Sequence, residues 1–159
     1  MSFSTELKEE LSKTENLSNK EAVKYELLGY LISSNITSER NKTKFSTENE
    51  YNINRFSRLL SNMGINNHDI EIQGKIFVIT VNTKDLKSIE YAENLNMDQI
   101  RWIIKGTYLG AGSINNPEKK YHLEIRFAQK QDAENVIQYL QAFDIKSNMI
   151  EKIINILCI

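Results

Sequence analysis

The chain has 159 residues, which is enough for one domain or for two small halves that share a core. Its 20 basic and 21 acidic side chains give a net charge of −1, which excludes a strongly basic nucleic-acid-binding composition, so any binding face must come from local charge. The single cysteine, Cys158, excludes an internal disulfide, and no apolar run approaches the roughly 20 residues of a membrane span. Because the N-terminal segment is charged from Glu6 onward, we expect no signal peptide and a cytoplasmic protein.

The hydrophobic pattern predicts two similar series of elements, preceded by a short helix. That first helix carries Phe3, Leu7 and Leu11 on one apolar stripe. In the first series we expect a helix at 20–34, a hairpin of strands at 36–40 and 44–48, a helix at 52–63, a second hairpin at 69–72 and 76–81, and a short amphipathic helix at 84–94. Gly64 is expected to end the 52–63 helix as a C-terminal cap.

The second series repeats this order. We expect a strongly apolar helix at 97–110, a strand at 121–127, a helix at 131–143 and two final strands within 145–159. The 121–127 strand alternates between two faces, with Leu123, Ile125 and Phe127 opposite His122, Glu124 and Arg126. Such alternation is typical of a strand with one face toward a core.

The two series can be aligned on each other. Residues 45–65 match residues 125–145 at a shift of 80, and the preceding helices match at a shift of 77, which places Gly29 on Gly106. The difference of three residues falls in the hairpin that contains Pro117, where loops tolerate insertion. Any two amphipathic helices align in part, but the single loop gap favours an internal repeat. We therefore predict an N-terminal helical segment at 1–19, a first repeat at 20–95 and a second repeat at 96–159.

Small residues mark the two predicted central helices. Gly106 and Gly110 are four residues apart and share a helix face, where another backbone can approach closely. Gly29 is the equivalent of Gly106, so we expect these three glycines at a helix–helix interface. A phosphate-binding loop is excluded, because no lysine followed by Ser or Thr comes after the glycines and the helix precedes the strand. No cofactor is expected.

Two stretches carry a family resemblance. The start "MSFSTELKEEL" and the segment "IIKGTYLGAGSINNPEKKYHLEI" (103–125) resemble the WhiA family of bacterial transcription and cell-division regulators, and the repeated helix and strands resemble the LAGLIDADG homing-endonuclease fold. This resemblance implies an α+β fold in which two pseudo-symmetric αββαββ repeats form a saddle of antiparallel sheets, with the central helices packed at the pseudo-twofold axis. It also implies a helix-turn-helix domain, which we expect to lie outside these 159 residues.

The resemblance bears directly on catalysis. In a homing endonuclease of this fold, an acidic residue near the end of each central helix holds a divalent metal. When the nine-residue motif is placed on 27–35 and on 104–112, Ser34 and Ala111 stand at those acidic positions. Neither side chain can anchor a metal. The resemblance therefore implies a scaffold without nuclease activity, catalytic residues or bound metal.

No other catalytic cluster is recognisable in the sequence. Asp98 and Glu118 lie near the second motif, but neither has a partner at the equivalent place in the first repeat. His68 and His122 stand alone and are predicted to be solvated surface residues. Trp102 lies on the apolar central helix, which favours packing over base stacking.

The hairpins of the predicted saddle offer a polar face that can lie along a DNA duplex. The candidate DNA-binding side chains are Arg40, Lys42 and Lys44 in the first repeat and Lys119, Lys120 and Arg126 in the second. Such cations contact phosphates and give salt-dependent binding that is largely independent of sequence. The alternative is that they are ordinary solvated side chains. With a net charge of −1, we expect weak binding through this region alone.

The function expected from these observations is that of a WhiA-like regulator. We expect a catalytically inactive, DNA-binding transcriptional regulator of sporulation and cell division, which is a monomer associated with the nucleoid. Its partners would be double-stranded DNA and, through other surfaces, further proteins. The alternative is a protein-interaction module that has kept the endonuclease scaffold and has no DNA role of its own.

Overall fold

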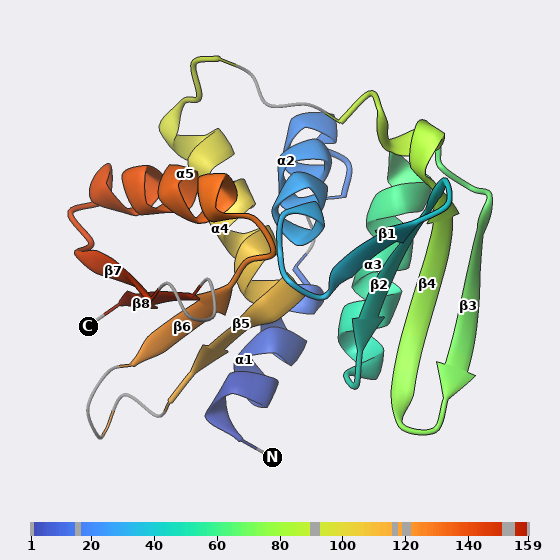
Figure 1. Cartoon of the computed structure of the whole chain (residues 1–159), viewed down its shortest axis with the longest axis horizontal. Helices are drawn as coiled ribbons and strands as arrows, with labels where there is room; N and C mark the ends of the chain where they lie inside the picture. Colours follow the sequence, from blue (N-terminus) through green and yellow to red (C-terminus); the bar gives the residue numbers. More distant parts are fainter. Residues whose placement is uncertain are drawn as a thin grey trace.

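Two sheets flank a central pair of helices, α2 and α4 (Figure 1). The computed structural model describes residues 2–14, 17–89, 93–115, 118, 122–150 and 155–158, the last four by their backbone alone. The elements of the first half are α1 (Phe3–Ser12), α2 (Lys20–Leu31), β1 (Ile36–Glu39), β2 (Lys42–Thr47), α3 (Glu50–Asn62), β3 (His68–Gln73), β4 (Ile76–Asn82) and the 3₁₀ turn η1 (Thr83–Leu86). Those of the second half are α4 (Met97–Ala111), β5 (Gly112–Ile114), β6 (Leu123–Arg126), α5 (Lys130–Gln141), β7 (Ser147–Ile150) and β8 (Asn155–Cys158). None of the helices in these described ranges is long and apolar enough to cross a membrane.

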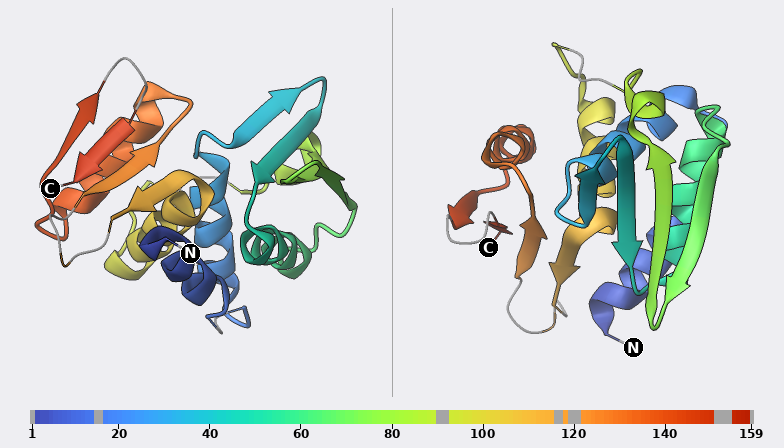
Figure 2. Two further views of the ribbon diagram at one scale, coloured as in Figure 1. Left: turned by 90° about the horizontal axis from the view of Figure 1, so that it is seen from below. Right: turned by 45° about the vertical axis from the view of Figure 1, so that its right-hand side comes forward.

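Both halves have the same strand order. The first sheet runs β1-β2-β4-β3 and the second β5-β6-β8-β7, and all neighbouring strands are antiparallel. Just beyond each central helix, the fully buried Phe45 and Ile125 pair with Ile36 and Gly112 respectively. Figure 2 shows the two sheets diverging on opposite sides of the central helices. The predicted α+β fold with two αββαββ repeats is therefore confirmed.

A two-residue turn fixes the first hairpin. Arg40 and Asn41 have positive φ values of 47° and 66°, the left-handed pair that matches the twist of the flanking strands. The turn sets the register in which Glu39 pairs with Lys42. Lys44 is two residues farther along β2 and therefore projects to the same face as Lys42.

The prediction of a short helix at 84–94 is wrong for the part of that range that the structure describes. The structure has a single 3₁₀ turn, η1, followed by Ile89, whose side chain is buried and whose amide donates to the Leu86 carbonyl at 3.0 Å. Residues 90–92 lie outside the described residues. A helix this short is costly to nucleate, so the burial of Ile89 decides the path of the chain instead.

Helix α2 also ends earlier than the sequence pattern predicts. The Ser33 hydroxyl donates to the Tyr30 carbonyl at 2.7 Å, and Ser33 forms an isolated antiparallel bridge with Phe127. The amide of Ser34 donates to the Arg126 carbonyl at 3.0 Å. Pairing with the second half thus replaces the last expected turn of helix. It also brings the end of α2 beside β6.

A buried ion pair holds the end of α1 against the core. The side chains of Glu26 and Arg55 are fully buried, and Arg55 donates two hydrogen bonds to Glu26, at 2.7 and 3.0 Å. Lys105 lies 2.9 Å from the same carboxylate. Burial lowers the pKa of Lys105, although Glu26 acts in the opposite direction. Another N–H of Arg55 donates to the Thr14 carbonyl at 2.7 Å, so the segment after α1 is fastened to α2 and α3.

Candidate nucleic-acid interface

Helices α2 and α4 meet at their glycines. A Cβ atom added to Gly29 would lie 2.7 Å from Gly106 Cα, and one added to Gly106 would overlap the Glu26 carbonyl oxygen. A Cβ atom added to Gly110 would lie 2.8 Å from the Cβ of Ser33. No side-chain carbon fits at such distances, so these glycines allow the two backbones to touch. The C-terminal ends of both helices are thereby brought side by side.

The two residues that the motif alignment predicts at the degenerate acidic positions, Ser34 and Ala111, lie at one shared hollow. Ser34 follows α2, Ala111 is the last residue of α4, and both line a hollow of 320 Å³. The other lining residues come from α1, the loop before β1, β5 and β6; they are Lys8, Asn35, Gly112, Ser113, Glu124 and Arg126. Asn35 donates its side-chain amide to the Gly110 carbonyl at 2.8 Å, which joins the two halves at this point. The hollow therefore lies where the two repeats meet.

Lys8, Glu124 and Arg126 are the charged side chains of this hollow. Arg126 Nε donates to Glu124 Oε1 at 3.4 Å. Among the residues that the structure describes, Lys8 makes no ion pair, and its ammonium lies 5.6 Å from the centroid of the Tyr108 ring. Burial lowers the pKa of Lys8 to about 8. The hollow thus contains a half-buried ammonium group that no described carboxylate neutralises.

The predicted cations of the first repeat lie on the β1–β2 hairpin. Arg40 occupies the turn, and Lys42 and Lys44 lie on the solvent face of β2; all three side chains are exposed. Lys42 Nζ donates to Asn82 Oδ1 at 2.6 Å, which steadies its side chain against β4. The hairpin therefore presents its positive charge to solvent.

Arg126 is the one predicted cation of the second repeat that lies within the described residues. Its side chain is 60% exposed and projects from β6, the strand whose place in the second sheet matches that of β2 in the first. It shares the polar face with Glu124, opposite the buried Ile125. Lys119 and Lys120 lie outside the described residues. The described cations are therefore divided between two sheets rather than gathered in one cluster.

Acidic side chains share the solvent face of the first sheet. Lys44 pairs with Thr80 of β4, and Thr80 pairs with Asp69 of β3. Residues paired across strands project to the same face, so Asp69 and Glu71 lie on the face of Lys44. Both acids are exposed and belong to the edge strand β3. The positive charge of this face is accordingly confined to the inner strand β2 and the turn that precedes it.

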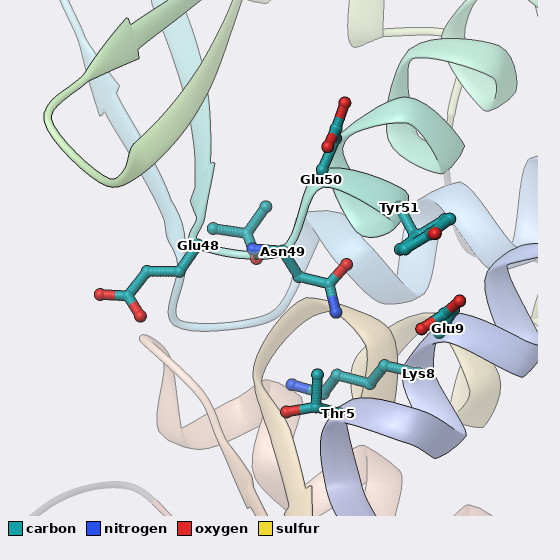
Figure 3. A pocket seen from close by; sticks show the side chains of 8 residues that line it. Thr5, Lys8, Glu9, Glu48, Asn49, Glu50 and Tyr51 are labelled. Atoms are coloured by element: carbon teal, nitrogen blue, oxygen red, sulfur yellow. Dashed lines mark hydrogen bonds between the residues drawn. The ribbon is translucent and has the colours of Figure 1, made fainter. Parts of the chain in front are cut away.

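A second concavity, of 480 Å³, lies between α1 and the start of α3 (Figure 3). Its acidic lining residues are Glu9, Glu48 and Glu50, and Lys8 and Tyr51 lie beside them. Figure 3 shows the three carboxylates pointing in different directions. Over the described residues, no group of three or more His, Cys, Asp or Glu side chains could hold a metal ion. This concavity therefore lacks the converging ligands of a metal site.

The two histidines differ in their surroundings. His68 is half-buried, with one ring nitrogen 2.8 Å from the Ser57 hydroxyl and the other 3.0 Å from the Ile65 carbonyl. The prediction of a solvated His68 is therefore wrong, because the ring joins α3 to the start of β3. His122 is exposed, as predicted, and its Nε2 lies 3.9 Å from Glu124 Oε2.

Lys8 is the residue of the hollow that the sequence pattern does not reveal. It lies on α1, which in the sequence is a separate amphipathic helix with no link to the glycine motifs. The signal that was present is its position beside Leu7 and Leu11 on the apolar side of that helix. A lysine at such a position is half-covered by whatever the helix packs against.

Comparisons with known proteins show a resemblance to one family. Residues 100–156 match the family model of the WhiA LAGLIDADG-like domain. The chain is 25% identical over 183 aligned positions to a probable cell division protein WhiA of Clostridium tetani, with 96% of this chain and 58% of that protein covered. The chain thus spans a little over half the length of this relative. The resemblance to the WhiA family that the sequence predicted is confirmed.

Solved structures give the same result for the fold. The N-terminal LAGLIDADG domain of DUF199/WhiA superimposes with a TM-score of 0.78 at 25% identity, over 98% of this chain and 84% of that one. I-DmoI, solved in complex with DNA and Ca, superimposes with a TM-score of 0.64 at 16% identity, over 88% of this chain and 83% of that one. I-DmoI is a homing endonuclease, and this likeness concerns the fold alone.

Proposed function

We propose that this chain, which resembles the WhiA LAGLIDADG-like domain in sequence and fold, is a catalytically inactive DNA-binding domain of a transcriptional regulator of sporulation and cell division. The observation that carries the proposal is the position of the exposed cations Lys42, Lys44 and Arg126. They project from β2 and β6, which hold equivalent places in the two sheets. Cations on two diverging sheets suit the two phosphate backbones of a duplex, which set the position of a protein on DNA without reading its sequence.

The charge of the saddle implies weak and salt-dependent binding. Asp69 and Glu71 on the edge strand oppose the cations of the same face, so the contact with phosphate is limited to the inner strands. Lys119 and Lys120, as predicted contacts in the loop between β5 and β6, would extend it. We propose on the same ground that the protein is cytoplasmic and associated with the nucleoid, where its duplex ligand would be.

The same proposal includes the absence of nuclease activity. A magnesium ion needs carboxylate oxygens, and the motif positions at the ends of α2 and α4 hold Ser34 and Ala111. Among the described residues, the carboxylate that lines the hollow is Glu124, which Arg126 already engages. We expect the purified chain to leave supercoiled DNA intact in Mg²⁺ or Mn²⁺. Metal-dependent cleavage that Glu124→Gln abolishes would refute this part of the proposal.

A titration of labelled duplex DNA at several salt concentrations tests the DNA-binding part. Lys44→Met and Arg126→Met each remove one phosphate contact, so each should raise Kd roughly threefold to tenfold and flatten the slope of log Kd against log salt by about 0.9. Lys20→Met is the matched control, because it removes the same charge at the opposite end of α2. If the wild-type chain shows no salt-sensitive binding, the proposal fails.

One observation favours the alternative, a protein-interaction module. Ile70 and Ile72 of the edge strand β3 are 47% and 68% exposed, and an edge strand with unpaired backbone groups can accept a further strand. Under this alternative, Ile70→Lys with Ile72→Lys would abolish capture of a partner protein and leave DNA binding unchanged. Under the main proposal, Lys44→Met and Arg126→Met weaken duplex binding, and the two isoleucine substitutions leave it unchanged.

A further inference from the structure

The hollow between the two repeats has the chemistry of an anion site. Among the described residues that line it, the charged side chains are two cations, Lys8 and Arg126, and one carboxylate, Glu124, which together carry one net positive charge. A divalent cation would need several carboxylate oxygens and would meet the ammonium of Lys8 instead. The hydroxyl side chains Ser34 and Ser113 also line the hollow and can donate hydrogen bonds to an anion.

Helix α1 is held so that Lys8 reaches this hollow. One turn before Lys8, the Ser4 hydroxyl accepts a hydrogen bond from the Ile114 amide of β5 at 3.3 Å. The same hydroxyl lies 3.1 Å from the Tyr108 hydroxyl of α4. Together with the hydrogen bond of Arg55 to the segment after α1, these contacts fix both ends of the helix. Lys8 is therefore placed by the fold rather than free to extend into solvent.

The acids near Lys8 are directed elsewhere. Glu9, the next residue along α1, pairs with Lys13 at 3.0 Å. Glu48 and Glu50 belong to the neighbouring concavity, where Figure 3 shows their carboxylates pointing away from the Lys8 side chain. Glu124 is paired with Arg126. Burial of the ammonium without a described carboxylate partner is costly, and a bound anion would offset that cost.

We propose that this hollow binds a phosphodiester group of the DNA backbone, with Lys8 and Arg126 as its cations and Ser34 and Ser113 as hydrogen-bond donors. The inference rests on the proposed DNA-binding function and adds a contact at the centre of the saddle. Lys8 then links the N-terminal helix to the ligand. The ammonium group of Lys8 then contacts the DNA backbone at the centre of the interface, where the repeats meet.

The test is a duplex titration against salt with four forms of the full chain: wild type, Lys8→Met, Lys8→Arg and Lys20→Met. Methionine keeps the length and apolar stem of Lys8, so the helix should still dock. We expect Lys8→Met to raise Kd roughly fivefold to tenfold and to flatten the salt slope by about 0.9, the loss of one phosphate contact. Lys8→Arg should restore both quantities, and Lys20→Met should match wild type.

Three results would overturn the inference, and each identifies its own cause. If Lys44→Met weakens binding while Lys8→Met leaves Kd and slope unchanged, the hollow takes no phosphate and the proposed function stands. If Lys8→Met raises Kd without changing the slope, Lys8 has only a structural role. If wild type binds no duplex at all, the inference fails together with the proposed function. This holds even if inorganic phosphate raises the melting temperature of wild type above its value in chloride of equal ionic strength. In that case the hollow binds small anions and not DNA.

Discussion

At the residue scale, the centre of the molecule depends on a few side chains whose size and charge are unusual for their positions. Gly29 and Gly106 remove the side chains that would keep α2 and α4 apart, and Ser34 and Ala111 leave small groups at the helix ends. Lys8 then brings a positive charge to the space between them. Among the described residues, this centre therefore combines the cations Lys8 and Arg126 with a single carboxylate, Glu124.

The glycine contact gives a graded prediction of stability. Gly106→Ala drives a methyl group into the backbone of Glu26, which cannot move aside, so we expect a loss of about 3 kcal/mol or more in the free energy of unfolding. Gly110→Ala meets mainly the side chain of Ser33 and should cost less. Urea denaturation measures both values.

A double variant supplies the control for this prediction. Because the obstacle at Gly110 is a side chain, Ser33→Gly should recover about 1 kcal/mol of the loss in Gly110→Ala, and it should recover nothing in Gly106→Ala. Equal costs for the two alanine variants, or rescue of Gly106→Ala by Ser33→Gly, would contradict the observed geometry.

The lowered pKa of Lys8 predicts a specific pH dependence of stability. Folding lowers this pKa from 10.5 to about 8, so between these two values the unfolded chain binds more protons than the folded chain. The Lys8 contribution to stability therefore rises with pH through that window, and it is least favourable below pH 8. We expect Lys8→Met to be more stable than wild type at pH 7, by about 1–2 kcal/mol after allowance for partial exposure.

The difference between the two proteins is the quantity to measure, because Lys105 and several tyrosines also have shifted pKa values. Denaturation of both forms at pH 7, 8, 9 and 10 should show the advantage of Lys8→Met shrinking above pH 8. An advantage that stays constant across this range would mean that Lys8 titrates at its ordinary pKa.

At the scale of elements, docking and register decide which charges act together. Helix α1 is fastened at one end through Ser4 and at the other through Arg55, so it forms part of the central hollow rather than a separate arm. In the first sheet, antiparallel pairing brings Asp69 of the edge strand onto the face of Lys44 through Thr80. Under the proposed function, the same sheet therefore carries both cations that attract DNA and acids that repel it.

This mixed face predicts a gain of affinity from removal of its acids. Asp69→Asn combined with Glu71→Gln should strengthen duplex binding, roughly threefold to tenfold at low salt, because two repulsive charges disappear from the face of Lys44. The matched control is Asp98→Asn, which neutralises an exposed acid at the start of α4. A gain in the control as large as in the double variant would show that only net charge matters.

At the scale of the whole molecule, the two repeats share a topology and one continuous apolar core, but they differ in their buried charged residues. The buried Glu26 and Arg55 have Ile103 and Asn135 as their equivalents at the shifts of 77 and 80, so the ion pair exists in the first half alone. Asn52 of α3 donates to the Leu109 carbonyl of α4 at 2.5 Å and thereby joins the halves. Shared contacts of this kind favour unfolding as one unit.

The single tryptophan allows a test of this coupling. Phe56 is fully buried beside Tyr30 and Phe45 in the first half, so Phe56→Ala should cost about 3–5 kcal/mol. Trp102 lies on α4 and packs against the core. We expect the unfolding midpoint measured by Trp102 fluorescence and the midpoint measured by far-ultraviolet circular dichroism to fall by the same amount in this variant.

The exposed Ser61 of α3 supplies the control, because Ser61→Ala should change stability by less than about 0.5 kcal/mol. If Phe56→Ala lowers the unfolding midpoint seen by circular dichroism but leaves the midpoint seen by Trp102 fluorescence unchanged, the halves unfold separately. The coupling through Asn52 would then be negligible.

The sequence alone determined the features that depend on the spacing of hydrophobic residues close together in the chain. The 3.6-residue and two-residue periods predicted the repeated order of helices and hairpins, and the strand order confirms it. The sequence resemblance to the WhiA family is confirmed, and the placement of Ser34 and Ala111 at the acidic positions of the motif stays a prediction. Local hydrophobicity and spacing are properties of neighbouring residues, so they can be read along the chain.

Tertiary structure decided the rest, because it depends on contacts between distant segments. Lys8 enters the central hollow only because α1 docks against β5 and α4, about a hundred residues away in the sequence. Asp69 faces Lys44 only through the register of three strands, and α2 ends early only because Ser33 pairs with Phe127. Docking and register are set by side-chain burial across the whole fold, and no short stretch of sequence contains that information.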